Sequence, residues 1–428
     1  MPTPFEFSPV KLVYGGEALG FHAGRTVFAP LVLPGERALV EEVRRQKSVT
    51  FARPLRILQS SPDRIEPQCQ YFGRCGGCQY QHLSAESQLA TKTEILRESL
   101  RRLGQIKWEG PITAHSGPAW NYRNQAQLKI GKSPDGSQAI GFYEAESNRL
   151  VSIDACPILS PRLNALLSVL RAEPWINDLA AGTELELMAD DQDQKVMLIL
   201  AGSWLEDEAE TLATKLLAEL EGVSTVAIKR TESLKIYGDP YLPYRVDAFS
   251  YRIGPTAFFQ SARFLLPEFV TAVTAGVSGS VALDLYAGVG LFALPLSKQF
   301  DQVIAVEVAP QATANLAANA RTIPDKKIRA VAGTTFDYLR RSALMNPDLV
   351  VLDPPRAGVG AETLELLATM RPKRLHYVSC SPPTLARDLG MMLKHGYQLD
   401  SLELFDFFPQ TYHIESLARL SPVGREHA

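Results

Sequence analysis

Three of the five cysteines of this 428-residue chain lie within ten positions, in the stretch CQYFGRCGGC. Cys69, Cys75 and Cys78 are spaced C-x5-C-x2-C, and clustered thiols in a chain without a recognisable export signal favour a metal site over disulfide bonds. Cys156 is the other cysteine outside the C-terminal third, so we expect it to be the fourth ligand. Four thiolates can hold a tetrahedral zinc ion or a four-iron four-sulfur cubane, and the spacing alone allows both.

The fifth cysteine, Cys380, ends the apolar stretch RLHYVSC and is followed by Ser-Pro-Pro. A cysteine within a strand is most often a small buried apolar residue, but one at the end of a strand is presented at the sheet edge. Such a thiol can act as a nucleophile, provided that a base lies nearby. The late stretch FFPQTYHIESLARL offers His413 and Glu415, which we expect on one β segment, facing the same side.

A glycine-rich turn, DLYAGVGLF, follows one apolar strand, and the next apolar strand ends at Glu307. An acid at this distance can accept hydrogen bonds from the ribose hydroxyls of a bound cofactor. Taken alone, GVGLFA fits a nicotinamide dinucleotide as well as S-adenosylmethionine. Two later motifs, VVLDPPRAG and YVSCSPPTLARDL, place polar residues just after a strand, and a hydride-transfer enzyme does not need them together.

The elements that must position these groups are readable. From residue 280, apolar strands alternate with helical stretches, which predicts a doubly wound, largely parallel sheet with ligands at the carboxyl ends of its strands. SAESQLATKTEILRESLRRLG predicts a helix with Ser84 as N-cap and Gly104 past its end. Between residues 121 and 260, alternating strands, a DDQDQ hairpin turn and a helix at EDEAETLATKLLAEL predict an α+β region.

Residues 8–58 form short β segments broken by Gly and Pro, a pattern typical of a small OB-like barrel. The chain carries a net charge of −3, but residues 1–130 hold 17 Lys and Arg against 11 Asp and Glu. Basic residues lie on the expected last strands of this barrel, where such folds commonly bind nucleic acid: Arg44, Arg45, Lys47, Arg53 and Arg56.

The length predicts several domains, which we place at residues 1–60 (barrel), 61–270 (central α+β region) and 271–428 (doubly wound sheet). Hydrophobic residues make up 46% of the chain and charged residues 21%, and no run of eighteen apolar residues could span a bilayer. We therefore expect a cytoplasmic protein that does not bind membranes, and we expect a monomer.

Two resemblances to known families follow from these motifs. The stretch GGEALGFHAGRTVFAPLVLPGERALVEEV resembles a TRAM domain, a small RNA-binding barrel. FFQ, DLYAGVG, DPPRAG, YVSCSPPTLARDL and HIE occur in the order found in the RNA uracil C5-methyltransferase family, over essentially the whole chain. Within that family, the chain is most similar to members that combine a TRAM barrel with an iron-sulfur cluster, as in the enzyme that methylates a uridine of 23S ribosomal RNA.

The resemblance implies an α/β fold: a C-terminal class I methyltransferase sheet of Rossmann-like type, a central α+β domain and an OB-like barrel. It implies methyl transfer from S-adenosylmethionine to carbon 5 of a uridine, expected in 23S ribosomal RNA, through a covalent bond between Cys380 and carbon 6, with Glu415 as base. The implied cofactor contacts are Gln260, Tyr286, Glu307 and Asp353, and the implied ligands of a 4Fe-4S cluster are Cys69, Cys75, Cys78 and Cys156. The chain departs from the family pattern at Ala262, Ala287, Thr334 and Ser381.

Four alternatives remain at this point. The target could be transfer RNA, and the chain could be an RNA-binding protein that has kept a methyltransferase fold without activity. A radical S-adenosylmethionine enzyme also combines a TRAM barrel with a cluster, but its signature is C-x3-C-x2-C and it leaves Cys380 without a role. A nicotinamide oxidoreductase is separable by testing whether the protein binds NADH or S-adenosylmethionine.

Overall fold

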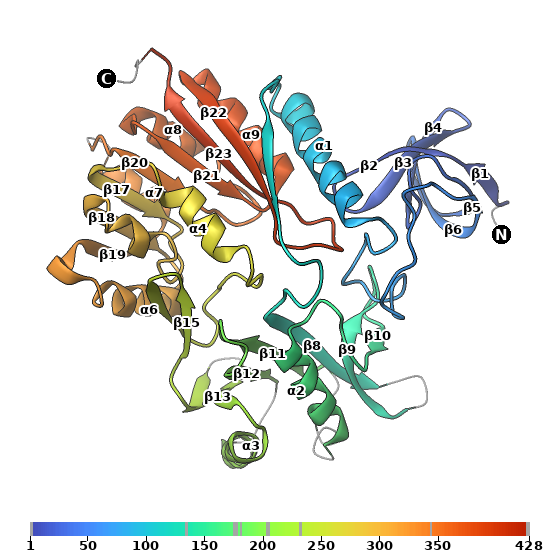
Figure 1. Cartoon of the computed structure of the whole chain (residues 1–428), viewed down its shortest axis with the longest axis horizontal. Helices are drawn as coiled ribbons and strands as arrows, with labels where there is room; N and C mark the ends of the chain where they lie inside the picture. Colours follow the sequence, from blue (N-terminus) through green and yellow to red (C-terminus); the bar gives the residue numbers. More distant parts are fainter. Residues whose placement is uncertain are drawn as a thin grey trace.

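The computed structural model describes residues 3–132, 136–173, 179, 182–202, 206–230, 233–342 and 345–424. Within them the strands form three large sheets and one two-stranded hairpin, and the three sheets are the cores of three regions that meet near the middle of the molecule (Figure 1). The N-terminal region lies at the right of the view, the central region at the bottom and the C-terminal region at the upper left.

The N-terminal region is a curled six-stranded sheet in the order β1-β5-β6-β4-β3-β2. The OB-like strands expected over residues 8–58 are present, and β1 adds a further strand by pairing antiparallel with β5. Its small apolar core includes Phe7, Val27 and Val40. The strands are β1 (Phe5–Phe7), β2 (Pro9–Leu12), β3 (Glu17–His22), β4 (Arg25–Pro30), β5 (Arg37–Gln46) and β6 (Val49–Gln59).

The central region is a seven-stranded sheet in the order β10-β9-β8-β11-β12-β13-β14. The predicted DDQDQ turn joins β11 to β12, which pair antiparallel. Leucines of the helix α2 pack on the sheet, while Met188, Met197 and Ile199 belong to a core shared with the C-terminal region. The elements are β8 (Gln125–Lys132), β9 (Gln138–Tyr143), β10 (Leu150–Ser152), α2 (Pro161–Ala172), β11 (Glu184–Ala189), β12 (Val196–Ala201), α3 (Glu206–Glu219), β13 (Val223–Lys229), β14 (Leu234–Gly238) and the hairpin β15 (Leu242–Val246) and β16 (Phe249–Ile253).

The C-terminal region is an eight-stranded sheet in the order β19-β18-β17-β20-β21-β23-β22-β7, which confirms the predicted class I methyltransferase arrangement. Strands β17 to β21 are parallel, and β23 runs antiparallel between β21 and β22. The elements are α4 (Leu266–Thr274), β17 (Gly279–Leu285), α5 (Ala293–Leu296), β18 (Phe300–Glu307), α6 (Pro310–Ala320), the 3-10 turn η2 (Pro324–Lys326), β19 (Ile328–Ala332), α7 (Thr335–Arg341), β20 (Leu349–Leu352), α8 (Ala361–Met370), β21 (Leu375–Ser379), α9 (Pro382–Lys394), β22 (Tyr397–Asp406) and β23 (Glu415–Pro422).

Two elements that precede the central sheet pack on the C-terminal sheet. The helix α1 (Ala85–Leu103) begins after its N-cap Ser84 and ends at Gly104, as predicted. Gly104 touches α9, since a Cβ there would lie 2.5 Å from the carbonyl oxygen of Ala386. The strand β7 (Ile112–Ser116) pairs in parallel with β22 at the sheet edge. The chain therefore enters the C-terminal sheet before it builds the central one.

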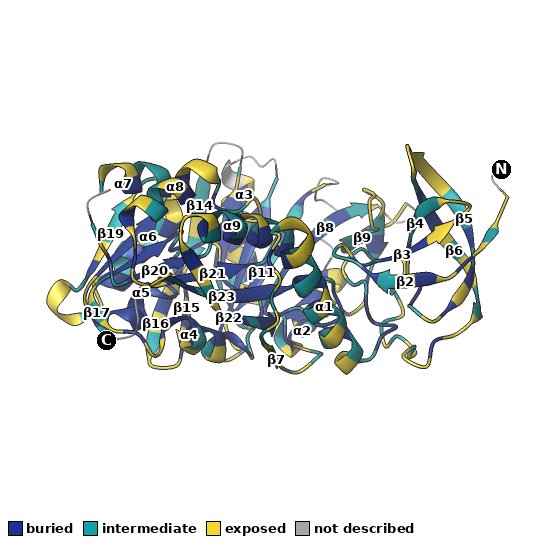
Figure 2. Ribbon diagram, turned by 90° about the horizontal axis from the view of Figure 1, so that it is seen from above, coloured by how far each residue is buried: buried dark blue, intermediate teal, exposed yellow. Residues whose placement is uncertain are grey.

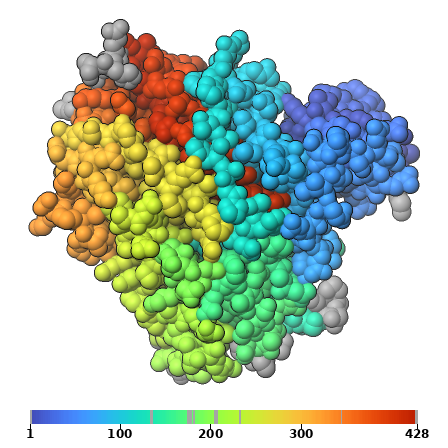
Figure 3. All heavy atoms as spheres, in the orientation of Figure 1, coloured from blue at the N-terminus to red at the C-terminus, as the bar shows by residue number. Residues whose placement is uncertain are grey.

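The buried residues form continuous layers through the sheets, with exposed residues on the outer turns (Figure 2). In the space-filling view, atoms of the last segment of the chain appear where the three regions meet (Figure 3). No helix of the described residues is long and apolar enough to cross a membrane.

Candidate active site

Cys380 and Glu415 lie at the ends of adjacent strands. The antiparallel pairing of β21 with β23 ends at Ser379 and Ser416, and Cys380 and Glu415 are the residues next to this last pair. They are near enough that, beyond the effect of burial, the charge of Glu415 raises the pKa of the Cys380 thiol. The hydroxyl of Ser416 donates to the carbonyl of Ser379 at 3.0 Å, which fixes the two strand ends against each other. The structure thus brings the predicted nucleophile and base together.

Two acids and one cation set the electrostatics of this pair. Asp353 follows β20, and burial raises its pKa to about 7. Burial, and then the Asp353 carboxylate, raise the pKa of Glu415 well above its usual range. Burial, followed by Glu415 and Asp353, raises the pKa of the Cys380 thiol to about 11. The guanidinium of Arg356 opposes these effects and lowers the pKa of both Cys380 and Glu415.

The glycine-rich turn after β17 is held open as a cradle. Gly288 and Gly290 have φ values of 56° and 95°, and a Cβ on Gly290 would lie 2.8 Å from Leu316. Tyr286 also takes a positive φ of 63°, a strained conformation that bulky residues adopt mainly at functional sites. Glu307, at the end of β18, accepts hydrogen bonds from the backbone N–H groups of Gly288, Val308 and Ala309 at 2.7–2.9 Å. The turn and the acid are therefore one unit.

Asp284 was missed by the sequence reasoning. It lies near the end of the apolar strand β17 and is fully buried, and neither carboxylate oxygen has a hydrogen-bond partner of normal geometry among the described residues. Burial, and then Asp353 and Glu307, raise its pKa well above the usual range, although the nearby backbone N–H of Ala293 opposes this rise. A buried carboxylate without a partner indicates that a ligand completes the site. The signal in the sequence was an acid within SVALDL, which the turn motif beside it overshadowed.

Gln260 approaches from the hairpin side. It is buried directly after Phe259, whose ring lies 6.0 Å from that of Tyr251. The Tyr251 hydroxyl donates to the carbonyl of Leu291, just past the glycine-rich turn, at 3.0 Å. Gln260 thus follows Phe259, which packs against Tyr251, and Tyr251 in turn holds the segment just after the glycine-rich turn.

The DPPRAG motif depends on the later motif YVSCSPPTLARDL. Asp388, on α9, accepts hydrogen bonds from the backbone of Val359 at 2.9 Å and from the hydroxyl of Tyr377 at 2.6 Å. Arg387 donates to the carbonyl of Ala357 at 2.8 Å. A Cβ on Gly358 would lie 2.5 Å from both side chains, so glycine is required there. The two motifs occur together because Arg387 and Asp388 of the later motif hydrogen-bond the backbone of the loop that contains DPPRAG.

Comparisons with known proteins agree with this geometry. Residues 84–422 match the sequence model of the family described as tRNA (Uracil-5-)-methyltransferase. The chain belongs to this family. A 23S rRNA (uracil(1939)-C(5))-methyltransferase of Shewanella sediminis is 33% identical, covering 95% of this chain and 93% of the relative, and an uncharacterized RNA methyltransferase of Aquifex aeolicus is 34% identical, covering 97% and 98%. The crystal structure of the Pyrococcus abyssi tRNA (uracil-54, C5)-methyltransferase with S-adenosyl-L-homocysteine aligns with a TM-score of 0.74 at 24% identity, over 97% of this chain and all of the other.

Family membership excludes two of the alternative functions, a nicotinamide oxidoreductase and a radical S-adenosylmethionine enzyme. It confirms the family inferred from the motifs and the class I fold. The domain boundaries and the roles of single residues stay predictions.

The N-terminal barrel of the methyltransferase reaches the active site, which the sequence did not indicate. The hydroxyl of Tyr14, between β2 and β3, donates to the backbone carbonyl of Cys380 at 3.2 Å. Its ring packs edge-on against Tyr412 at 5.4 Å between centroids. Lys11 forms an ion pair with Glu98 of α1. The barrel is therefore in direct contact with the segment that carries Cys380, the predicted nucleophile.

The four remaining cysteines line one cavity of about 430 Å³, together with Arg123 and His413. Burial, with a smaller effect of the neighbouring thiols, raises the pKa of Cys78 to about 12 and that of Cys156 to about 11. Within the described residues, no three Cys, His, Asp or Glu side chains are arranged to hold a metal ion. The structure brings the four thiols to one place but spreads them around its wall.

One sequence prediction about the base was wrong. His413 does not share a β segment with Glu415, because β23 begins at Glu415 and His413 lies in the preceding loop. Its Nδ1 lies 3.4 Å from the guanidinium of Arg356, and burial, followed by Arg356 and Arg123, lowers its pKa to about 4. Pro409 and the turn that follows it in FFPQTYH delay the start of the strand by two residues. His82, four residues after Cys78, is buried.

Proposed function

We propose that this protein transfers a methyl group from S-adenosylmethionine to carbon 5 of a uridine in RNA, with Cys380 as nucleophile and Glu415 as base. The observation that supports the proposal is that Cys380 and Glu415 directly adjoin the last paired residues of β21 and β23, Ser379 and Ser416, near enough that, beyond the effect of burial, the charge of Glu415 raises the pKa of the Cys380 thiol. Class I sheets bind their ligands at the carboxyl ends of their parallel strands, and Cys380 directly follows one of these strands.

Carbon 5 of uracil is a weak nucleophile, so the thiolate of Cys380 first adds to carbon 6 and the electron pair moves to carbon 5 and the carbonyl. When bound, S-adenosylmethionine supplies a methyl group activated by a sulfonium. After carbon 5 is methylated, it still carries its original hydrogen. Glu415 removes that proton, the carbon 5–carbon 6 double bond forms again, and the thiolate of Cys380 leaves.

The negative charges of three acids near the glycine-rich turn complement the positive charge of the cofactor. Asp284, Glu307 and Asp353 lie at the carboxyl ends of β17, β18 and β20, and the sulfonium is a cation. A cation beside buried carboxylates stabilises their charged forms. We assign Glu307 to the ribose, and Gln260, Tyr286 and Asp353 to the remainder of the cofactor pocket.

For the target we propose 23S ribosomal RNA, supported by relatives of that name that match over more than nine tenths of both chains. Transfer RNA is the second candidate, favoured by the name of the family and of the structural neighbour. Nucleoside mass spectrometry should find 5-methyluridine in 23S ribosomal RNA from cells that carry the gene and lose it in cells without the gene. Loss from transfer RNA alone would assign the second target, and loss from neither would refute the activity.

We propose further that Cys69, Cys75, Cys78 and Cys156 hold a four-iron four-sulfur cluster. Zinc bound by thiolates brings its sulfur atoms within about 3.8 Å of one another, from Zn–S bonds of about 2.3 Å. The four thiols line one cavity of about 430 Å³, and the resemblance to the iron-sulfur members of the family favours a cluster there, with one thiolate on each iron. The cysteine-bearing segment is joined to the central sheet, for example by the N–H of Gly76 donating to Tyr143 at 2.9 Å, so the group would fasten two parts of the chain.

Iron and sulfide analysis tests this assignment. Protein purified without oxygen should contain about four irons and four sulfides per chain, by the composition of a cubane. Cys156→Ala should lower the yield of folded protein more than it lowers the activity of the part that folds. Stoichiometric zinc without sulfide would show that the assignment is wrong.

A further inference from the structure

The loop that leads into Glu415 is held by groups from outside it. We call residues 407–414, between β22 and β23, the base loop. In Figure 1 this loop extends from the C-terminal sheet toward the lower end of α1. Glu415 is 3% exposed, and its Oε1 has no protein partner among the described residues. The position of the carboxylate is therefore set by the backbone on either side of it.

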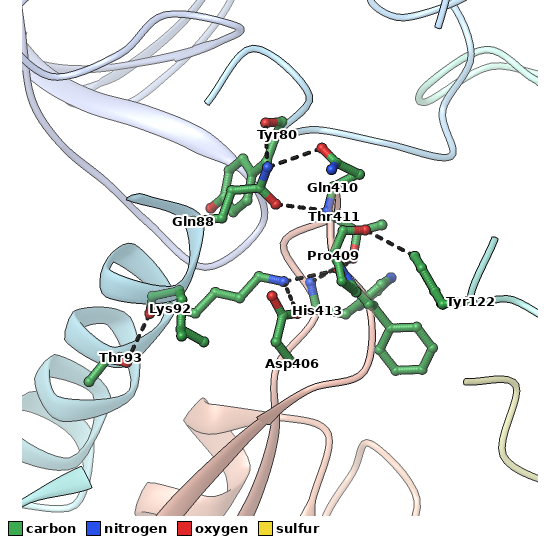
Figure 4. A network of polar contacts seen from close by, with 12 residues as sticks. Tyr80, Gln88, Lys92, Thr93, Tyr122, Asp406, Pro409, Gln410, Thr411 and His413 are labelled. Atoms are coloured by element: carbon green, nitrogen blue, oxygen red, sulfur yellow. Dashed lines mark hydrogen bonds and ion pairs between the residues drawn. The ribbon is translucent and has the colours of Figure 1, made fainter. Parts of the chain in front are cut away.

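Gln88, on α1, binds the centre of the base loop through its amide. Its Oε1 accepts from the backbone N–H of Gln410 at 2.8 Å, and its Nε2 donates to the side-chain oxygen of Gln410 at 3.0 Å (Figure 4). The same Nε2 donates to the carbonyls of Tyr80 and Leu83. Both glutamines are buried. One side chain thus joins the base loop to the segment that follows the cysteines.

Gln410 is also strained. Its φ is 70°, which a non-glycine residue adopts only at a cost in free energy and only where its surroundings enforce it. Here the backbone N–H binds Gln88, and the carbonyl accepts from the N–H groups of Gln79 and Tyr80 at 2.9 Å each. These contacts hold the bend five residues before the base.

Lys92, one turn further along α1, grips the start of the loop. Its ammonium lies 2.6 Å from Asp406, the last residue of β22, and donates to the carbonyl of Phe408 at 3.0 Å. Lys92 is fully buried and Asp406 is 5% exposed. The hydroxyl of Tyr122 donates to the next carbonyl, that of Pro409, at 2.9 Å. Figure 4 shows these groups converging on the loop from separate segments.

We propose that Gln88 and Lys92 are positioning residues for the proton abstraction by Glu415. Residues four apart lie on one face of a helix, so α1 presents both to the base loop. The contacts end on Asp406, Phe408 and Gln410, in the segment that leads into Glu415, whereas Cys380 lies between β21 and α9 and none of these hydrogen bonds reaches it. Loosening the loop therefore slows the removal of the carbon 5 proton and leaves thiolate addition and methyl transfer in place. This inference rests on the proposed roles of Cys380 and Glu415.

The experiment separates methyl transfer from release. Gln88→Met keeps the side-chain length and removes the amide, and Lys92→Met with Asp406→Asn removes the buried pair without leaving a lone charge. Single-turnover transfer of labelled methyl to RNA should stay within about twofold of the parent enzyme. Steady-state turnover should fall about 10- to 100-fold, the range of a general base that is partly lost. A covalent enzyme–RNA species carrying the label should accumulate on a denaturing gel, with KM for RNA unchanged.

Thr93→Val is the matched control, because this α1 hydroxyl donates within its own helix to Leu89 and does not touch the loop. It should retain parental turnover. Tyr122→Phe, which removes one hydrogen bond to the loop, gives a milder variant that decides the question if the others do not fold.

Glu415→Gln is measured in parallel. If it does not trap the labelled species, the proposed base is wrong. Alternatively, Glu415→Gln traps the species while the Gln88 and Tyr122 variants lose single-turnover and steady-state rates in equal proportion without trapped enzyme. In that case the contacts of Gln88 and Lys92 with the base loop are merely structural, and the inference is overturned.

Discussion

The thiol and the carboxylate of the active site are both stabilised in their protonated forms. Burial raises the pKa of Cys380 to about 11 and that of Glu415 well above its usual range, yet the reaction that we propose needs the thiolate and the carboxylate. Arg356 lowers both pKa values from a position at the solvent edge. The site therefore depends on positive charge to become reactive.

The division of labour between Cys380 and Glu415 is the most direct test at this scale. Cys380→Ala should abolish both methyl transfer and the covalent species, because no sulfur can add to carbon 6. Glu415→Gln should still add and methylate but keep the enzyme bonded to methylated RNA, with turnover lowered at least about 100-fold. Denaturing gels with labelled methyl groups report both outcomes. Free turnover by the Glu415 variant, or trapped species from the Cys380 variant, would contradict the assignment.

The pH dependence of turnover should respond to Arg356. Activity requires deprotonated groups whose pKa values are raised, so turnover should increase as pH rises. Removing the guanidinium in Arg356→Gln raises the pKa of Cys380 and Glu415 further, so the rising limb should move to higher pH, by roughly half a unit for an exposed charge. Arg321→Gln, an exposed change on α6, should leave the limb in place. A shift to lower pH would reverse the sign of our argument.

Sequence patterns located the proposed nucleophile and base more easily than the residues that support them. Cys380 and Glu415 stood at strand ends inside specific motifs, so their position was readable. Asp284 looked like part of an apolar strand, so nothing in the pattern indicated a role in the site. Tyr14 lies more than 360 positions from Cys380, so only the folded chain reveals that these two residues are in contact. The register of β23 was misjudged around His413 because turn geometry, rather than side-chain alternation, decides where that strand begins.

At the scale of elements, strong local signals were reliable. The helix α1 begins and ends where its caps predict, and the hairpin turn between β11 and β12 is in place. The strand β7 was not predicted, because ITAHS is short, half exposed and without alternation. Its strand conformation comes from pairing with β22, a partner far away in the sequence. Tertiary pairing of this kind overrides weak local propensity.

The contact between α1 and α9 should tolerate no side chain at Gly104. A methyl group there would lie 2.5 Å from the carbonyl of Ala386, while the φ of −85° is ordinary for alanine, so the effect is steric. Gly104→Ala should lower the free energy of unfolding by about 1–3 kcal/mol, seen as a lower melting temperature. Gly117→Ala meets only ordinary contacts of 3.4 Å or more and serves as the control. Equal melting temperatures for the two variants would show that the helices can move apart freely.

At the scale of the whole molecule, the barrel has two separable tasks. Its exposed basic residues suit phosphate binding, whereas Tyr14 contacts the nucleophile segment. Arg45 and Arg53 are paired with Glu42 and Glu41, so Lys47 and Arg56 offer the cleaner test of charge.

Lys47→Gln with Arg56→Gln should weaken RNA binding and reduce the slope of log affinity against log salt by about one to two, one phosphate for each lost charge. Tyr14→Phe should instead lower turnover and leave that slope unchanged. Filter binding across a salt series distinguishes them, with Arg321→Gln and Lys326→Gln, two exposed residues between α6 and β19 of the C-terminal region, as the control. An unchanged slope in the barrel variant would exclude this surface from RNA binding.

The early placement of α1 and β7 has a consequence for biosynthesis. Gln88 and Gln410 are 322 positions apart, so α1 leaves the ribosome long before the loop it clamps. Until then the apolar face of α1 and the edge of β7 have no native partner, and contacts between distant segments form slowly. Nascent chains that end before β22 therefore expose apolar surface that is prone to aggregation. We expect synthesis of this enzyme to depend on chaperones that cover α1 until β22 and β23 have been made.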